Sequence, residues 1–102
     1  MWAQMIKDRV KPGQESASQQ LQQEMEARFQ GDVSGRGPNR VIVMQDQNDT
    51  GTYITVIFFE SEAQARENER SPEVAALQER MMQIWEGPPE FTDLNVIHEV
   101  SR

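Results

Sequence analysis

The spacing of apolar and polar residues changes several times along the chain, and each change predicts a new element of secondary structure. Segments in which apolar and polar residues alternate predict β-strands, and segments in which apolar residues recur once per helical turn predict helices. The changes fall at Trp2 (alternating), Ser16 (helical), Arg40 and Thr52 (both alternating), Ser61 (helical) and Phe91 (alternating). The pattern therefore predicts the order strand, helix, strand, strand, helix, strand.

Turn residues bound the predicted strands. Pro12 and Gly13 end the first strand, because proline has no N–H to donate to the ladder and glycine frees the backbone. Residues 46–51 have the polar and glycine composition of a hairpin turn, which predicts antiparallel pairing of the strands on either side. The alternation that begins at Phe91 continues almost to the end of the chain, so we expect the last strand to run to Val100.

Serine residues mark the predicted helix starts. Ser16 with Gln19 has the form of a capping box, and so does Ser61 with Gln64. Pro72 is a residue type favoured at the first position of a helix, because the missing N–H has no partner there in any case. We therefore expect the second helix to be broken or kinked at Pro72.

The predicted order of elements is that of the ferredoxin-like fold. In this α+β arrangement, βαββαβ, four strands form an antiparallel sheet and the two helices cover one of its faces. The strands are apolar on both faces at Ile42/Val43 and Ile57/Phe58, so the uncovered face also needs a partner. We therefore predict an obligate homodimer of a single domain, residues 1–102. The side chains expected at its interface are Trp2, Ile97 and Val100.

Charge and composition exclude several classes of function. The net charge of −7 disfavours a nucleic-acid or membrane partner, because nucleic acids and anionic lipids repel a negative surface. The absence of cysteine excludes disulfides, thiolate chemistry and cysteine-ligated metals. With one histidine and no acidic motif of ligand spacing, no metal is expected. The longest apolar run, Val56–Phe59, is too short to cross a bilayer, and we expect a cytoplasmic protein.

Four side chains are candidates for a functional site, each with a structural alternative. His98 is the only histidine, the residue type that most often moves protons at neutral pH; the alternative is a structural residue near the dimer contact. Tyr53 offers a phenolic group as a pocket wall or an interface anchor. Trp85 ends an apolar helical stripe and either fills the core or stacks on a flat ligand. Gln4 is polar among apolar neighbours, and either faces solvent or orients a ligand.

Four segments resemble a known family. They are Met5–Val10 with Lys11-Pro12-Gly13, Tyr53–Phe59 running into Glu60-Ser61-Glu62-Ala63, Ser71-Pro72-Glu73, and Asn95–Val100. Over nearly the whole chain they resemble the antibiotic-biosynthesis-monooxygenase group of dimeric α/β barrels. The resemblance implies two ferredoxin-like units that pack sheet against sheet, with a small-molecule pocket between each sheet and its helices.

The resemblance also implies a class of activity. Members of the group include cofactor-free oxygenases of quinols and polyketides, and haem-degrading enzymes. The haem-degrading branch has an Asn on its first strand, a Trp on its third and a His on its second helix, whereas this chain has Gln4, Phe58-Phe59 and no His in that helix. The remaining expectation is a monooxygenase that uses no cofactor and acts on a small aromatic, quinol or polyketide-like molecule.

Two functions are therefore open from the sequence. The first is the monooxygenase, for which we expect His98 and Tyr53 to be catalytic and Gln4 and Trp85 to contact the substrate. The second is a non-catalytic small-molecule-binding or interaction module on the same dimeric barrel, which needs no catalytic constellation. A deep apolar cavity near Trp85 and His98 favours the enzyme, and a filled core favours the module.

Overall fold

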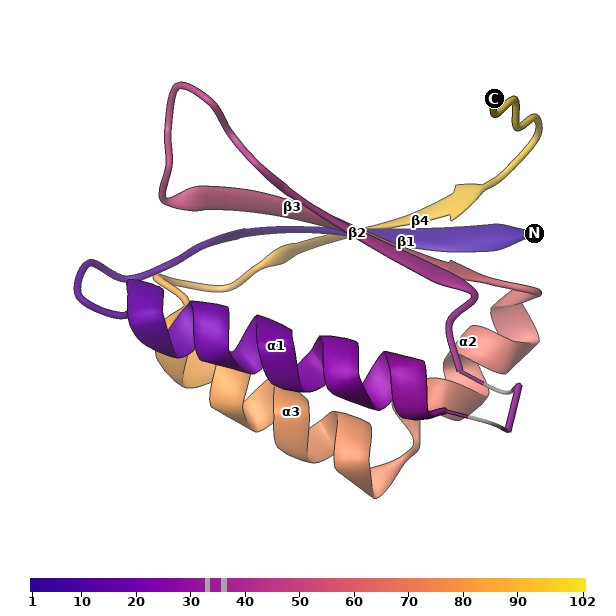
Figure 1. Ribbon diagram of the computed structural model, residues 1–102, viewed down its shortest axis with the longest axis horizontal. Helices are drawn as coiled ribbons and strands as arrows, with labels where there is room; N and C mark the ends of the chain where they lie inside the picture. The colour runs from indigo at the N-terminus through magenta and orange to yellow at the C-terminus, as the bar shows by residue number, and fades with distance from the viewer. Residues whose placement is uncertain (33, 36) are drawn as a thin grey trace.

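The structure is a computed structural model that describes residues 1–32, 34–35 and 37–102. Its strands are β1 (Trp2–Arg9), β2 (Arg40–Gln45), β3 (Thr52–Phe59) and β4 (Glu90–Asn95), and its helices are α1 (Glu15–Gly31), α2 (Glu62–Glu69) and α3 (Pro72–Ile84). The strands form one antiparallel sheet in the order β2-β3-β1-β4, and the helices lie together on one side of it (Figure 1). The predicted ferredoxin-like α+β fold is confirmed.

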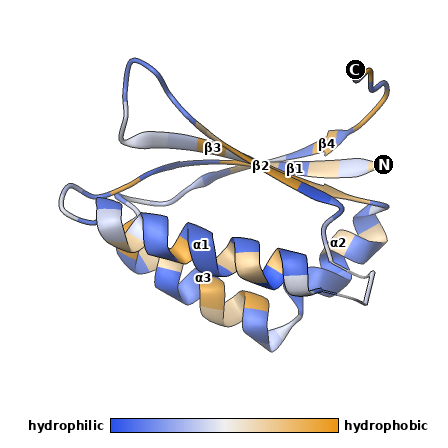
Figure 2. Cartoon of the chain, viewed as in Figure 1, coloured by the Kyte–Doolittle hydropathy of each residue, from blue (hydrophilic) through white to orange (hydrophobic). Residues whose placement is uncertain are grey.

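The central strand β1 divides its side chains between the two faces of the sheet. It pairs with β3 on one side, where Gln4 is opposite Ile57 and Asp8 is opposite Tyr53, and with β4 on the other. Because side chains of a strand alternate, Gln4, Ile6 and Asp8 all face the helices. Figure 2 shows that α1 is hydrophilic along much of its length, as expected of a helix with one solvent-facing side.

Two clusters of buried side chains hold the helices on the sheet. At one end Trp2 and Phe59 pack with Ala65 of α2, and the two rings lie 6.2 Å apart between centroids. At the other end Val10 packs with Leu21 of α1 and Ile84 of α3; the side chains of this second cluster are half-buried or buried. Trp2 is only 6% exposed within its own chain, so the prediction that it anchors a dimer interface is wrong.

Two of the three sequence signals for a helix start, Ser61 and Pro72, are confirmed by the structure, and the third, Ser16, is not. Ser61 caps α2, since its hydroxyl accepts a hydrogen bond from the Gln64 N–H at 3.2 Å. The predicted break at Pro72 is confirmed, because α2 ends before it and α3 begins with it. The predicted capping box at Ser16 is wrong: the N-cap of α1 is Gln14, which has no side-chain capping bond. The turn after β1 leads directly into the helix, which leaves Ser16 inside the first turn.

The last strand ends earlier than its alternating pattern predicts. Asn95 pairs with Trp2, and the N–H of Val96 donates to the carbonyl of Met1 at 3.1 Å. Beyond this point β1 has no residue left to pair with, so residues 96–102 adopt no regular secondary structure. The prediction of a strand to Val100 is therefore wrong, and Ile97 is 93% exposed.

None of the helices in the described part of the chain combines the length and the apolar character that crossing a membrane requires.

Candidate functional site

A cavity of about 1280 Å³ lies between the sheet and the helices. Its floor comes from all four strands, and its walls come from all three helices. The lining is mainly apolar and includes Ile6, Met25, Val41, Ile57, Leu77 and Met81. Its size exceeds the few hundred Å³ typical of small ligand pockets, so it has room for a bicyclic or larger aromatic molecule.

Three of the four residues singled out from the sequence line this cavity. Gln4 and Tyr53 contribute from the sheet, and Trp85 contributes from the end of α3. His98 is exposed and lies in the segment 96–102, outside the cavity of its own chain. The structure therefore brings Gln4, Tyr53 and Trp85 together and does not bring His98 to them.

Backbone hydrogen bonds place Trp85 beside β1. The residue follows α3 directly, and its N–H donates to the carbonyl of Met81 at 2.9 Å. It also forms an isolated antiparallel bridge with Val10, and the Lys11 N–H donates to the carbonyl of Ile84 at 2.9 Å. These bonds join the end of α3 to the end of β1, so the indole is held where the two elements meet.

Trp85 lies beside Asp8, a cavity residue that the sequence reasoning missed. Asp8 lies on the helix-facing side of β1, lines the cavity and is half-buried. Burial raises the pKa of Asp8 from 3.8 to about 6, because a charged carboxylate loses hydration there, and the hydrogen bond from Trp85 lowers the pKa by a smaller amount. A signal was present in the sequence, since Asp8 continues the face of Gln4 and Ile6 at the spacing of a strand.

A neighbouring ion pair orients the amide of Gln4. Its Nε2 donates to Oδ1 of Asp93 at 3.3 Å, and the other carboxylate oxygen of Asp93 lies 2.7 Å from the guanidinium of Arg66. The guanidinium of Arg66 also lies 5.2 Å from the centroid of the Trp2 ring, within the range of a cation–π contact. Gln4 is half-buried, so its amide carbonyl is available as a polar contact on an otherwise apolar floor.

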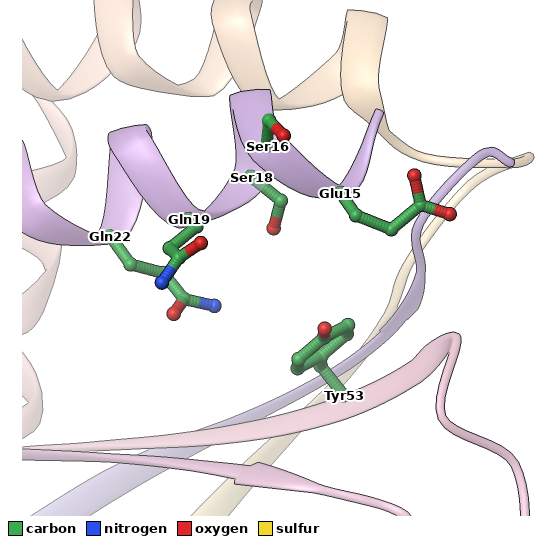
Figure 3. Close-up of a pocket in the computed structure, with 6 residues that line it drawn as sticks. All are labelled: Glu15, Ser16, Ser18, Gln19, Gln22 and Tyr53. Atoms are coloured by element: carbon green, nitrogen blue, oxygen red, sulfur yellow. The ribbon is translucent and has the colours of Figure 1, made fainter. Parts of the chain in front are cut away.

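Tyr53 stands between the large cavity and a smaller polar hollow of about 270 Å³. The smaller hollow is lined by side chains at the start of α1, which lie over the Tyr53 ring in Figure 3. The phenolic oxygen of Tyr53 accepts a hydrogen bond from Nε2 of Gln45 at 3.3 Å. Its own proton is thus free to be donated to a ligand or to water, as a phenol both donates and accepts.

Acidic side chains collect at the opposite end of the cavity from Asp8. The lining there includes Glu26, Asp32, Glu67, Glu69 and Glu73, with Arg28 as a counter-charge. Arg28 lies 3.2 Å from Glu73, so part of its charge is already paired. Within the described residues no three of His, Asp and Glu lie close enough to hold a metal ion.

Comparison with solved structures identifies the same fold in named proteins. No protein-family model matches the sequence, and no curated protein matches it. A structure named antibiotic biosynthesis monooxygenase is 12% identical and covers 96% of this chain and 100% of its own, with a TM-score of 0.80. Rv0793 from Mycobacterium tuberculosis is 17% identical over 98% of both chains, with a TM-score of 0.80.

A third structure has a stated activity. A variant of SnoaB, a cofactor-independent oxygenase from Streptomyces nogalater, is 9% identical and covers 99% of this chain and 97% of its own, with a TM-score of 0.80. At these identities the likeness is one of fold. It confirms the ferredoxin-like fold of the single chain that the sequence resemblance to antibiotic biosynthesis monooxygenases implies.

Proposed function

We propose that this chain is a cofactor-independent monooxygenase that acts on a small aromatic, quinol or polyketide-like molecule. The observation that carries the proposal is the cavity itself, a largely apolar space of about 1280 Å³ with Asp8, Tyr53 and Trp85 at one end. Such a lining suits a flat apolar molecule with a few polar groups. The fold shared with SnoaB, which is named a cofactor-independent oxygenase, supports the same class of activity.

The chemistry balances without a protein-derived electron. A hydroquinone and dioxygen give a hydroxyquinone and water: one oxygen atom enters the ring, the other leaves as water, and the ring supplies all the electrons. The protein then has to bind the ring, exclude water and move protons. We assign ring contact to Trp85, an orienting hydrogen bond to Gln4 and hydrogen bonding to the substrate hydroxyl to Tyr53.

His98 is the remaining residue of the sequence-based assignment. It reaches a substrate only if the segment 96–102 of one protomer lies over the cavity of its partner, because within its own chain it is exposed and outside the cavity. The proposal that His98 moves a proton is therefore separate from the roles proposed for the residues that line the cavity.

The working unit in this proposal is a homodimer. The face of the sheet opposite the helices carries Met5, Ile54, Val56 and Phe58, which are half-buried within one chain and have no helix over them. Figure 1 shows that all three helices lie on the other side. A second copy of the chain would remove this apolar face from water, which is the main driving force for association.

The test measures oxygen uptake with a panel of hydroquinones, phenols and polycyclic hydroxyarenes, compared with protein-free autoxidation. Isotopically labelled dioxygen then shows whether one oxygen atom enters the product, as monooxygenation requires. The key variant is Thr55→Trp, which places an indole in the floor of the cavity. Its matched control is Gln23→Trp, on the exposed side of α1 and not part of the lining.

Each outcome decides between the two functions. Uptake that is lost in Thr55→Trp and kept in Gln23→Trp supports the monooxygenase. Binding of aromatic molecules without oxygen uptake contradicts it and favours the non-catalytic binding module. Uptake that survives in Thr55→Trp contradicts the cavity as the site.

A further inference from the structure

Asp8 is a half-buried carboxylate in the lining of a mainly apolar cavity, and no described residue provides a counter-charge for it. It forms no ion pair with any described Lys or Arg, and the indole of Trp85 is the one described side chain whose interaction lowers its pKa. An indole N–H fills one of the roughly four acceptor positions of a carboxylate. The remaining positions are available to a ligand, because the side chain lines the cavity.

The described groups around Asp8 supply no cation to neutralise it. Tyr53 is its register partner on β3, and Glu15 lies near Tyr53 at the start of α1. The side chains of Lys7 and Arg9 fall on the opposite face of the sheet by the alternation of β1, and Arg9 is paired there with Asp49 and Glu86. The cavity walls nearest this end are uncharged and come from Ser18, Leu21, Met81 and Ile84.

We propose that Asp8 is the acceptor for the hydroxyl group of an uncharged hydroxyarene in this cavity, first as a hydrogen-bond acceptor and during turnover as the proton acceptor. The turnover part rests on the proposed monooxygenase function, and the binding part does not. Carboxylates at both ends of the cavity oppose a carboxylated ligand, because like charges at close range disfavour ionisation of each other. The ligand class is therefore a neutral phenol, naphthol or hydroquinone.

The proton transfer balances within the site. The O–H bond of the ligand breaks, a new O–H bond forms on a carboxylate oxygen of Asp8, and the electron pair stays on the ligand as a phenolate. No electron passes to the protein. The phenolate is richer in electrons than the phenol, so it is the form that gives electrons to dioxygen, the co-substrate of the proposed reaction. A base whose pKa is about 6 is ionised and ready to accept a proton at neutral pH.

The binding test compares two ligands that differ only in their ability to donate a hydrogen bond. The probes are 2-naphthol and 2-methoxynaphthalene, measured by fluorescence titration at about pH 5 and about pH 8, a range in which the naphthol stays neutral. We expect the preference for 2-naphthol to rise by about 10-fold between these pH values, since a hydrogen bond to a charged group is worth more than one to a neutral group. In Asp8→Asn the preference is expected not to change with pH.

The matched control is Asp46→Asn, in the turn between β2 and β3. Asp46 accepts hydrogen bonds from the N–H groups of Asn48 and Asp49, and an asparagine oxygen can accept the same bonds. This variant should behave as the unmodified protein does. A preference that stays constant with pH in the unmodified protein, a pH-dependent preference that persists in Asp8→Asn, or failure of both naphthalenes to bind overturns the proposal.

Measurements of turnover distinguish a failure of the Asp8 proposal from a failure of the proposed monooxygenase function. If a substrate is found, Asp8→Asn should lower kcat by about 100-fold or more and raise KM by about 10-fold at most, and the acid limb of the pH–rate profile near pH 6 should disappear. Full kcat in Asp8→Asn removes the proton-acceptor role and leaves the monooxygenase standing. Absence of oxygen uptake together with the expected naphthol preference removes the monooxygenase and leaves Asp8 as a binding residue.

Discussion

The side chain of Trp85 lies beside the carboxylate of Asp8 and lowers its pKa, although the two residues lie at nearly opposite ends of the chain. The contact depends on the bridge between Val10 and Trp85, which joins the end of α3 to the end of β1. It places Trp85 next to a half-buried carboxylate that lines the cavity between the sheet and the helices. The ionisation of Asp8 therefore bears on both the stability of the fold and the chemistry of the cavity.

Asp8 should make the protein less stable as the pH rises. Its pKa in the folded chain is about 6, above the ordinary 3.8, so the native state holds this proton more tightly than the unfolded state does. The stabilising contribution of the protonated group is fully present below about pH 4 and is lost as the pH rises through about 6. Asp8→Asn is neutral at every pH and keeps an acceptor oxygen beside Trp85. We expect it to be more stable than the unmodified protein at about pH 8, by about 1 kcal/mol after allowance for solvent screening.

Urea unfolding of both proteins across this pH range checks the prediction. The difference in unfolding free energy should shrink towards zero as the pH falls below about 3, because Asp8 is then protonated in both states. Asp46→Asn serves again as the control for the loss of an acidic side chain. A constant difference between Asp8→Asn and the unmodified protein at every pH would contradict the linkage.

Helix capping gives a second prediction, with an internal control. Ser61→Ala removes the acceptor for the Gln64 N–H at the start of α2 and should cost about 1 kcal/mol of unfolding free energy. Ser16→Ala removes a serine that caps no helix, so it should change stability by less than about 0.5 kcal/mol. Denaturant titration of the two variants at one pH is sufficient. Equal losses would mean that the cap at Ser61 contributes nothing specific.

The open face of the sheet gives a third prediction. Val56 lies on this face in β3, the strand between β2 and β1, so Val56→Lys would bury a charge in the proposed dimer contact. We expect the dimer dissociation constant to rise by about 100-fold or more, while circular dichroism shows a folded chain. Ala75→Lys, on the exposed side of α3, should leave association unchanged.

Sedimentation equilibrium measures both the unmodified protein and these two variants. A stable, folded monomer of the unmodified protein at micromolar concentration would exclude the obligate homodimer. Dissociation in Ala75→Lys as well as in Val56→Lys would point to a general loss of stability in place of a defined contact.

Local signals were sufficient for the order of elements but not for the site. The alternation of apolar residues and the position of Pro72 depend on neighbours in the sequence, and the structure confirms the order of elements along the chain and the helix break. The end of β4 depends on where β1 begins, and β1 has no residue left to pair beyond Asn95. The role of Asp8 likewise depends on Trp85, which a backbone bridge brings from another part of the chain. The spacing of residues along the sequence predicts neither contact, because each contact joins segments that are far apart in the chain.

The fourth prediction tests the proton role that the sequence suggests for His98. His98→Gln keeps the size and hydrogen bonding of the side chain but removes its ability to titrate near neutrality. Since His98 is exposed and lies outside the cavity of its own chain, we expect kcat for any accepted hydroquinone to stay close to that of the unmodified protein. Steady-state oxygen uptake, with dimer formation checked by sedimentation, makes the comparison.

A fall of about 100-fold in kcat with the fold and dimer intact would restore His98 as the base, and would require residues 96–102 of one protomer to reach the cavity of the other. Asp8→Asn measured in parallel then distinguishes the two assignments, because only the true proton acceptor removes the acid limb of the pH–rate profile when it is replaced.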